Sequence, residues 1–384
     1  MMPPSLDPMD PTSAPDPAGG WSCAIRSVPD ATVAHVPRGY LLHPSGVFDA
    51  DRAYVHQAVH WRGRPLMTPP PWPQRRDHLP GRWLWGGVLM DHFGHFLTES
   101  TGRLWALDHL DGPLDGIVFL PEKGFGKSPP PQAKTYQRLF LDLLGIDLPI
   151  RLLSAATRID QLEVPGPGFG IGPLMPGTRA FRTFIHTRLA PAIAPSGGEN
   201  LYISRSALDL SLGGILGERV LERHLASAGY DIYHPQNHSL PEQIARYRAA
   251  RRVISLDGSA LHLLAMVAPP DQSIAIIKRR KGSAPDGIIR HIAGFTGRQP
   301  TVIDVLNRSW IRSDRTRADN FSYGELNFHA LGTALAHAGF LPPDTDWPNM
   351  PQRRLRGAVE WLERRLRKQG LTFTPVPPLP EPRR

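Results

Sequence analysis

The sequence predicts an α/β protein of two domains, with a doubly wound parallel sheet in the second half. Two observations support this fold class. The chain has 384 residues, which is more than one hydrophobic core usually accommodates. Between residues 200 and 277, short apolar runs alternate with helix-like stretches of about ten residues, and this alternation is typical of a parallel sheet with crossover helices.

The first half of the chain has shorter and less regular apolar runs. Residues 1–20 are rich in Pro, Asp and Ser, which predicts a disordered tail. Gly and Pro interrupt the runs from 21 to 61, which favours short strands, and the prolines at 69–73 predict a loop. Further along we expect strands over 82–88 and 116–121, and helices over 91–109, 132–144 and 178–189. The strand, helix, strand order predicts a βαβ unit.

The second half begins after a Pro- and Gly-rich stretch, 191–198, which predicts a linker. Its expected strands cover 200–205, 230–233, 252–256 and 273–277, and its expected helices cover 217–228, 240–250 and 259–267. We therefore divide the chain into a tail (1–20), an N-terminal α/β domain (21–190), a C-terminal α/β domain (198–300) and a basic helical extension (301–384).

The composition limits the classes of function. Cys23 is the only cysteine, which excludes an intramolecular disulfide and a multi-thiolate zinc site. The formal net charge is +9. No apolar run is long enough to span a bilayer, so we expect a soluble, cytoplasmic protein. The charge fits nucleic acid, an anionic membrane or a nucleotide diphosphate. The basic runs 278–281, 312–317 and 353–368 are expected to be solvated surface.

The carboxyl ends of the expected parallel strands bear three polar loops: Ser204-Arg205, His234-Pro235 and Asp257-Gly258-Ser259. Ligands of such sheets bind beyond these ends. Arg205 follows the first strand, where a guanidinium suits a diphosphate; a surface pair with Asp209 is the alternative. Asp257, Gly258 and Ser259 follow the third strand, and their small size lets an anion approach the next helix, which Ser259 could cap. A tight structural turn is the alternative.

The stretch from Ser239 to Gln243 is a capping box in form. Ser239 is the expected cap, Pro241 lies in the first turn, and Glu242 lies three residues after the cap. Capping alone explains these residues. It leaves open a second role for Glu242 as an acceptor for a ribose hydroxyl.

The expected helix over 91–109 concentrates proton-accepting groups. Asp91, His92, His95 and Glu99 are groups that can take a proton from a sugar hydroxyl near neutral pH. His92, His95, Glu99 and Arg103 fall near one helix face at steps of three and four residues. Metal binding and purely structural histidines are the alternatives, and the spacing differs from that of His-Glu-x-x-His proteins.

Taken in order, five segments resemble the family 61 glycosyltransferases, many of which are bacterial proteins of capsular polysaccharide biosynthesis. The segments are Trp85-Gly86-Gly87, Asp91 to Glu99, Leu201 to Arg205, Ser239 to Gln243 and Asp257 to His262. The resemblance implies a GT-B-like fold of two Rossmann-like domains with an interdomain cleft. It also implies inverting transfer from a nucleotide-sugar donor to a glycan or polysaccharide acceptor, with no cofactor and no obligatory metal.

The resemblance also assigns roles. It places Asp91, His92, His95 and Glu99 at the acceptor, with Glu99 or His95 as the catalytic base. The C-terminal domain would bind the nucleotide sugar through Arg205, Glu242, Gln243, Asp257, Gly258, Ser259 and His262. The family often has His or Glu where this chain has Asp257, which leaves the role of that position open.

Two further hypotheses concern partners. The stripe Leu355, Val359, Leu362 and Leu366, with Arg on the other faces, could cover the back of a domain, or give peripheral contact with the inner face of a membrane or with an anionic glycan. The rival to catalysis is a basic protein that binds nucleic acid or another anionic polymer; it explains the charge but not the acid/base helix. A sulfotransferase would need an N-terminal phosphate loop that is absent from the sequence.

Overall fold

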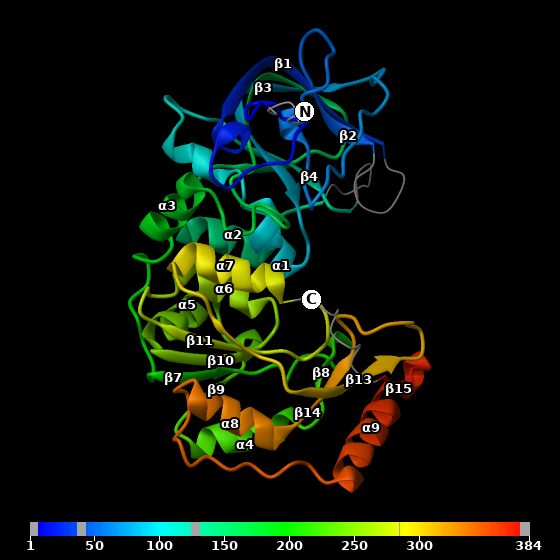
Figure 1. Cartoon of the computed structure of the whole chain (residues 1–384). Coiled ribbons are helices and arrows are strands. Elements are labelled where there is room, and N and C mark those ends of the chain that lie inside the picture. Colours follow the sequence, from blue (N-terminus) through cyan, green and yellow to red (C-terminus); the bar gives the residue numbers. More distant parts are fainter. Residues whose placement is uncertain (1–6, 37–43, 124–130, 284, 377–384) are drawn as a thin grey trace, which may run out of the picture. The chain divides into compact units, whose positions relative to one another are not determined.

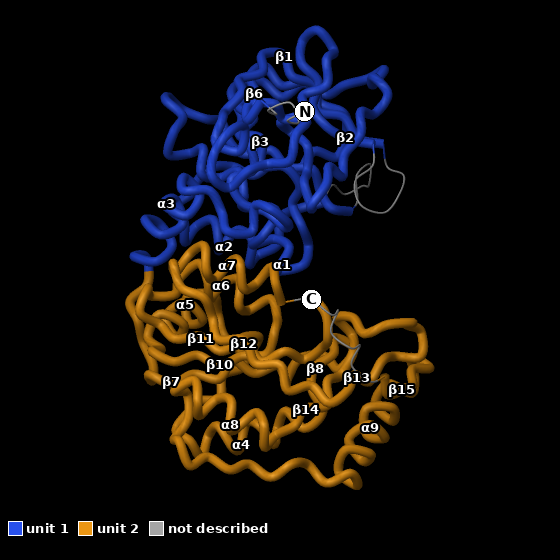
Figure 2. Tube along the Cα trace, in the orientation of Figure 1, with its two compact units in different colours: residues 1–192 blue, residues 193–384 orange. Residues whose placement is uncertain are grey.

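The computed structural model describes residues 7–36, 44–123, 131–283 and 285–376. The chain forms two compact units, residues 1–192 and 193–384 (Figure 2). The division falls inside the stretch that the sequence predicts as a linker. Each unit has its own sheet and its own core, and each is described by itself.

Unit 1 contains a six-stranded mixed sheet in the order β2-β1-β6-β3-β4-β5 (Figure 1). Strands β4 and β6 flank β3 in parallel, β5 lies parallel to β4, and β1 runs antiparallel to both β6 and β2. The strands are β1 (Ile25–His35), β2 (Ser45–Phe48), β3 (Asp77–Leu89), β4 (Gly116–Pro121), β5 (Ile150–Leu152) and β6 (Thr157–Pro165), and the longer helices are α2 (Thr135–Leu143) and α3 (Arg179–Arg188). The predicted βαβ unit is present as β3, β4 and β5, whereas the central strand β6 was not predicted.

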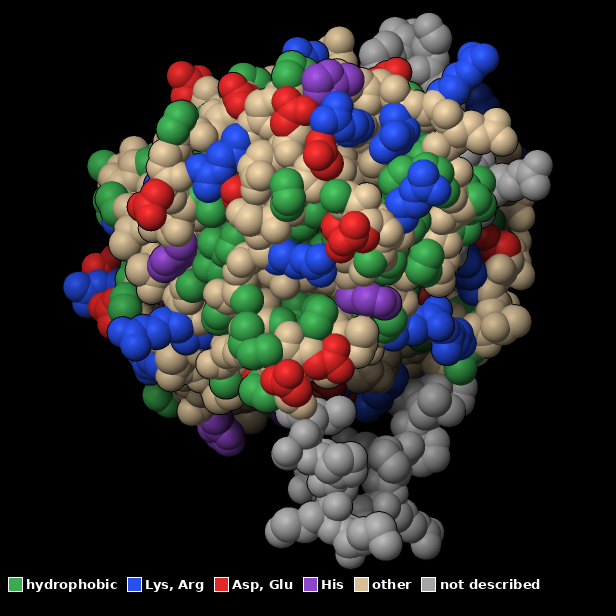
Figure 3. Space-filling model, turned by 90° about the horizontal axis from the view of Figure 1, so that it is seen from above, with side chains coloured by type: hydrophobic (Ala, Val, Ile, Leu, Met, Phe, Trp, Pro, Cys, Tyr) green, Lys and Arg blue, Asp and Glu red, His purple; other side chains and the backbone are tan. Residues whose placement is uncertain are grey.

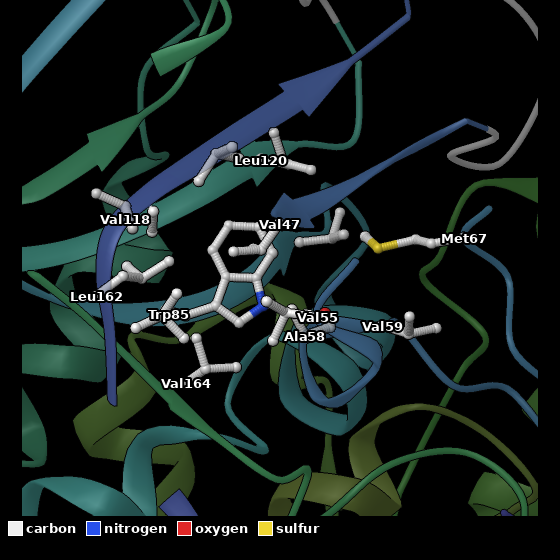
Figure 4. Packing of buried hydrophobic residues seen from close by; sticks show 14 of the residues in the cluster. Val47, Val55, Ala58, Val59, Met67, Trp85, Val118, Leu120, Leu162 and Val164 are labelled. Carbon is white, nitrogen blue, oxygen red and sulfur yellow. Dashed lines mark hydrogen bonds between the residues drawn. The ribbon is translucent and has the colours of Figure 1, made fainter. Parts of the chain in front are cut away.

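Trp85 of β3 lies in the centre of the unit 1 core. Its ring is packed among aliphatic side chains from the strands on either side and from the short 3-10 helix His56–Ala58 (Figure 4). The indole Nε1 donates to the carbonyl oxygen of Ala58 at 3.0 Å, so the one polar atom of this buried ring is satisfied. The sheet therefore fixes the segment that follows β3, where the acid/base residues lie.

Two expectations for the first half need correction. Residues 7–20 form hydrogen-bonded turns, and the backbone N–H of Trp21 donates to the carbonyl of Pro8 at 2.9 Å; residues 1–6 of the expected tail lie outside the described residues. The single helix expected over 91–109 is broken into three short pieces: α1 (Phe93–His95), a π-helical turn (Phe96–Ser100) and a 3-10 helix (Leu104–Asp108).

Unit 2 contains a five-stranded sheet in the order β12-β11-β10-β7-β9, in which each neighbouring pair is parallel. Numbered along the chain, this order is 2-1-3-4-5, a doubly wound arrangement of the flavodoxin type. The sequence prediction of a doubly wound sheet is therefore confirmed for this unit. The strands are β7 (Asn200–Ile203), β9 (Asp231–Tyr233), β10 (Arg252–Leu256), β11 (Ser273–Ile277) and β12 (Thr301–Ile303).

Helices cover both faces of this sheet. Helices α5, α6 and α7 lie on one face, and α4 and α8 lie on the other (Figure 1). The chain changes face where it passes from β9 to β10, because β10 pairs with β7 on the side away from β9. The helices are α4 (Glu218–Ser227), α5 (Leu240–Ala249), α6 (Ala260–Val267), α7 (Asp286–Thr296) and α8 (Phe328–His337).

Residues 301–376 belong to unit 2 and do not form a separate extension. Leu331 and Leu335 of α8 share a core with Ile254 of β10. A smaller sheet, in the order β15-β13-β14-β8, packs against the last helix, α9 (Gln352–Leu366); its strands are β8 (Gly214–Ile215), β13 (Leu306–Arg312), β14 (Tyr323–Leu326) and β15 (Phe373–Val376). Within the described ranges, no helix is both long and apolar enough to cross a bilayer.

Candidate active site

The segment after β3 departs from regular helix geometry because its hydroxyl side chains bond back to the chain. Thr98 Oγ1 donates to the carbonyl of Gly94 at 2.9 Å, and Thr101 Oγ1 donates to the carbonyl of Leu97 at 2.7 Å. Such bonds compete with the backbone ladder and bend helices. A π-helical turn within a helix is also frequent at functional sites. The turn buries Glu99 while the preceding turn leaves His95 half-exposed.

Four hydrogen bonds converge on the Glu99 carboxylate, whose side chain is fully buried. His95 Nδ1 lies 2.5 Å from Oε1, and His60 Nε2 lies 2.7 Å from Oε2. Arg62 donates through NH2 to Oε1 and through Nε to Oε2, both at 2.9 Å. Each carboxylate oxygen therefore accepts two bonds, which uses all its lone pairs.

The protonation states follow from this geometry. Burial by itself would raise the pKa of Glu99, but hydrogen bonds from His60, His95 and Arg62 outweigh burial and hold the pKa well below its usual range. An ionised carboxylate only accepts, so both histidines donate to it. A neutral His95 therefore carries its proton on Nδ1 and presents Nε2 as a lone pair. This is the orientation of a general base held by a carboxylate.

Arg103 is not part of this group, although the sequence placed it on the same helix face. Its side chain is buried and donates to the carbonyl oxygens of Pro165 and Val59. Burial lowers the pKa of Arg103 to about 9. Together with Glu99 and His60 it lines a cavity of about 20 Å³, which is about the size of one water molecule.

The structure brings only part of the predicted acceptor-side set together. The ring of His92 lies edge-on to that of His95, with centroids 5.3 Å apart, so His92 is a neighbour of the proposed base. Asp91 is exposed and is 3.4 Å from Lys134 Nζ, and its carbonyl accepts from Tyr136. Asp91 therefore has no contact with Glu99.

Replacing Glu99 by Gln should destabilise unit 1. The amide cannot accept from His60, His95 and Arg62 together, and losing one partner of a buried ion pair costs about 3 kcal/mol. Because the folded-state pKa of Glu99 is depressed, its carboxylate stabilises the fold above the ordinary glutamate pKa of about 4.3. That contribution is lost as the pH falls further, toward the folded-state pKa.

Urea unfolding between pH 3 and pH 8 measures both effects. The Glu99→Gln variant should be less stable at neutral pH and should show a shallower loss of stability in acid. Asp142→Asn serves as the control, because Asp142 is half-exposed and pairs with Arg138 on the surface of α2, so its loss should cost less than about 1 kcal/mol. Equal effects from the two substitutions would contradict the assigned state of Glu99.

The second group of charged residues lies at the carboxyl edge of the unit 2 sheet. Arg205 follows β7, and Asp257 follows β10. The chain continues from β7 to β9 on one side, and from β10 to β11 on the other side. Arg205 and Asp257 therefore flank the topological switch point, where ligands of doubly wound sheets bind. The sequence predicted both residues for this edge, and the structure brings them together.

Asp257 is fully buried and holds two arginines that follow β11. The backbone N–H of Arg279 donates to Asp257 Oδ1 at 2.9 Å, and the Arg279 Nε donates to the Asp257 carbonyl at 3.0 Å. Arg280 NH2 lies 3.2 Å from Asp257 Oδ2. The basic run 278–281 was expected to be solvated surface, and this is wrong for Arg279 and Arg280, which are 3% and 9% exposed.

Arg205 completes this cluster, and its expected surface pairing with Asp209 is wrong. Its NH2 donates to the carbonyl of Leu212 at 3.2 Å. Burial, then the charge of Arg279, lowers the pKa of Arg205 to about 10, and burial likewise lowers the pKa of Arg280 to about 10. Within the described part of the chain, the Nε atoms of Arg205 and Arg280 have no hydrogen-bond partner. Arg279 and Arg280 thus share the Asp257 carboxylate, and Arg205 lies near the charges of both Glu218 and Asp257. The surplus of positive charge suits a bound anion.

Neighbouring groups hold this cluster in place. Glu218 is buried and accepts from the backbone N–H of Arg205 at 2.7 Å and from the Tyr202 hydroxyl at 3.0 Å, which fixes the loop after β7. Burial raises the pKa of Glu218. Asp304, after β12, pairs with Lys278 and Lys281, so Asp257 is left to the two arginines between them.

The turn after β10 serves the arginine cluster. A Cβ on Gly258 would lie 2.8 Å from Arg205 NH1, so glycine leaves room for the guanidinium. Ser259 is the residue before α6, but its side chain makes no capping bond, so the expected cap is wrong. His262 Nδ1 lies 3.0 Å from His291 Nδ1 on α7. His262 therefore packs in the helical layer.

Glu242 and Gln243 have structural tasks at the start of α5. Ser239 Oγ accepts from the Glu242 N–H, and the Glu242 carboxylate accepts from the Ser239 N–H at 2.8 Å, so the predicted capping box is confirmed. The Glu242 side chain is 61% exposed. Gln243 Nε2 donates to the carbonyls of Pro235 and His238 and so fixes the loop after β9. A role of either residue toward a nucleotide stays a prediction.

Sequence reasoning missed four residues of the two clusters: His60, Arg62, Arg279 and Arg280. The strand-end rule that selected Arg205 and Asp257 also applies to β11, and it would have found Arg279 and Arg280. His60 and Arg62 lie in an irregular segment 39 and 37 residues before Glu99. No spacing in the sequence marks them as its partners.

In the described ranges, no group of three or more His, Cys, Asp or Glu side chains is arranged to hold a metal ion. Independence of a metal stays a prediction.

Comparison with known proteins adds to this geometry. None of the curated proteins matches the chain. The family model of glycosyltransferase 61 matches residues 93–275, a segment that contains His95, Glu99, Arg205 and Asp257. Residues 93–275 thus match the glycosyltransferase 61 family, and this match suggests glycosyltransferase activity.

Proposed function

We propose that the protein transfers a sugar from a nucleotide-sugar donor to a hydroxyl group of a glycan acceptor, with inversion at the anomeric carbon. The family match supports the reaction class. The two clusters supply the two things that inversion needs: a base for the attacking hydroxyl, and positive charge for the departing diphosphate. They lie in different units, and each role is argued from its own unit.

The base is His95. Glu99 is a poor candidate because both its oxygens are occupied and its pKa is depressed. His95 is 41% exposed in its side chain, so an acceptor hydroxyl can reach it. Its Nδ1–H bond to Glu99 orients the ring and stabilises the imidazolium that forms when Nε2 takes the proton. His60 and Arg62 act through Glu99 and are positioning residues.

The arginine cluster receives the leaving group. In an inverting transfer, the bond from the sugar to the β-phosphate oxygen breaks as the acceptor oxygen bonds to the anomeric carbon, and negative charge grows on the diphosphate. Arg205, Arg279 and Arg280 are fixed before the reaction by Asp257 and by backbone carbonyls. Fixed positive groups in a partly buried site stabilise such charge more strongly than water does.

The observation that carries the proposal is this buried surplus of guanidinium groups at the switch point of a parallel sheet. Three guanidinium groups lie near two carboxylates, Asp257 and Glu218, and the remaining positive charge costs free energy in this largely buried place unless an anion joins it. Arg280 and Lys281 also line a pocket of about 190 Å³ with Asp319 and Phe321, next to the cluster. The diphosphate of a nucleotide matches this arrangement in charge.

For the acceptor, the family match is the only support. We propose a glycan or polysaccharide acceptor and synthesis of a surface polysaccharide such as a bacterial capsule, in the cytoplasm. A nucleic-acid-binding protein without catalysis is less well supported, because such proteins present their cations on the surface to phosphates. Here Arg279 and Arg280 are buried, and Arg205 is partly buried.

Thermal shift with a panel of nucleoside diphosphates tests donor binding. One of them should stabilise the wild-type protein, by about 2.7 kcal/mol at a hundredfold excess over its Kd. Arg205→Gln should abolish this response. It should not lower the stability of the free protein, since it removes a cation that burial and Arg279 disfavour.

Arg252→Gln is the matched control. Arg252 opens β10 at the opposite edge of the same sheet and contacts Asn200 at 3.0 Å, so the response to the diphosphate should persist. If no nucleoside diphosphate stabilises the wild type while DNA or RNA does, the proposal is wrong. If Arg205→Gln and Arg252→Gln respond alike, the assignment of the cluster is wrong.

A further inference from the structure

Helix α9 has two faces of opposite character. Leu355, Val359, Leu362 and Leu366 are buried and share a core with Tyr323 and Phe373 of the small sheet, so this stripe covers unit 2, as one of the sequence hypotheses predicted. The opposite face is exposed. Its cations, together with those of the short 3-10 helix that follows, are Arg353, Arg354, Arg356, Arg364, Arg365, Arg367 and Lys368.

Trp361 lies in the middle of this outer face. Its position on the helical wheel is next to Arg354, Arg365 and Lys368, and the Arg365 guanidinium lies 5.7 Å from its ring centroid. Trp361 is 41% exposed. Among the Phe, Trp and Tyr side chains of the described residues, it is the only one that is exposed. Trp is enriched at protein interfaces and at membrane–water boundaries, where its ring has an apolar and a polar side.

The outer face carries little compensating negative charge. Of the two acids in α9, Glu363 accepts from the backbone N–H of Phe373, and only Glu360 is exposed, 4.0 Å from Arg364. Figure 3 shows another face, seen from above the view of Figure 1, on which Lys and Arg side chains lie among Asp and Glu. The outer face of α9, with the short 3-10 helix, carries seven exposed cations and one exposed acid.

We infer that the outer face of α9 docks on an anionic lipid surface. Cations attract the headgroups, and each contributes while it remains within a Debye length of the surface. The indole of Trp361 suits the boundary between headgroups and acyl chains. A single straight helix presents its cations along a convex line, which fits a planar surface and lacks the groove in which proteins hold a nucleic acid strand. This inference does not depend on the proposed activity.

Co-sedimentation of the full chain with vesicles tests the inference. The wild type should bind vesicles of phosphatidylcholine that contain roughly 30% phosphatidylglycerol. It should bind neutral phosphatidylcholine vesicles more weakly, by roughly tenfold or more. Arg364→Glu with Lys368→Glu should lower the partition coefficient on anionic vesicles by roughly tenfold or more, and Trp361→Ala should lower it by a smaller factor. Arg364, Lys368 and Trp361 are all exposed, so folding should be retained, which circular dichroism verifies.

The matched control reverses the same number of charges elsewhere on unit 2. Arg290 and Arg298 are exposed and lie at α7 and just after it, and Arg290→Glu with Arg298→Glu should leave vesicle binding within about twofold of wild type. Equal loss in both double variants would show that only net charge matters and would overturn the inference. Equal binding to neutral and anionic vesicles would overturn the inference too. A protein that binds RNA or an anionic glycan through α9, and does not bind vesicles, would also overturn it.

Discussion

Substituting His95 by Asn should lower kcat by 10²- to 10⁴-fold, roughly, which is the contribution of a positioned general base. The Asn side chain retains a donor near the position of Nδ1, so the bond to Glu99 is kept, while the Nε2 lone pair is removed. Stability and donor binding should therefore change little. The release of nucleoside diphosphate in the presence of acceptor, followed over a range of pH, measures the effect.

His109→Asn is the control for this substitution. His109 is exposed in the same segment and packs edge-on against Trp105 at 5.4 Å, so kcat should remain within about twofold of wild type. A His95→Asn enzyme with unchanged kcat would rule out His95 as the base.

Substituting Asp257 by Asn should destabilise the free protein by about 3 kcal/mol, because two buried arginines lose their shared counter-charge. The same change makes the cluster more positive. Inorganic pyrophosphate should therefore stabilise Asp257→Asn more than it stabilises the wild type, and at saturation it should recover much of the lost stability. Thermal melting with and without pyrophosphate measures both effects.

Asp304→Asn provides the comparison. Asp304 lies at the end of the next strand but one, pairs with two lysines and is about a quarter exposed in its side chain. Its loss should cost less, and it should leave the response to pyrophosphate unchanged. If pyrophosphate stabilises Asp257→Asn no more than wild type, Asp257 is not the counter-charge of an anion site.

The sequence was most informative where its local pattern is regular. The strands β7, β9, β10 and β11 each have a short apolar run with a helical stretch after it, so their existence and their common carboxyl edge could be predicted. Arg205 and Asp257 follow directly from that edge. The order of the strands is not local information, however, and the placement of β10 beside β7 is what turns two separate loops into one cluster.

The burial of charged side chains was the property that was predicted least well from the sequence. The run 278–281 has the composition of a solvated surface. In the structure, however, Asp304 pairs with its two lysines, and Asp257 contacts Arg279 and Arg280, which are buried. In α9 the same type of composition is indeed on the surface, because its apolar residues recur at helical spacing. Charge counts alone do not distinguish the two cases.

The acid/base segment shows a second limit. A regular helix was assumed over 91–109, whereas Thr98 and Thr101 bond back to the chain and a π-helical turn results. The pairing of His95 with Glu99 was predictable from their four-residue spacing. The contributions of His60 and Arg62 were not, since long-range pairing through a buried carboxylate leaves no local pattern.

The most direct test of the glycosyltransferase proposal is a single assay on three proteins. Wild type, His95→Asn and Arg205→Gln are incubated with a panel of nucleotide sugars and a glycan acceptor, and both bound donor and released nucleoside diphosphate are measured. The proposal predicts that wild type binds and turns over one donor, that His95→Asn binds it with little turnover, and that Arg205→Gln does neither. Failure of the wild type to bind or cleave any nucleotide sugar, or full turnover by both variants, would contradict it.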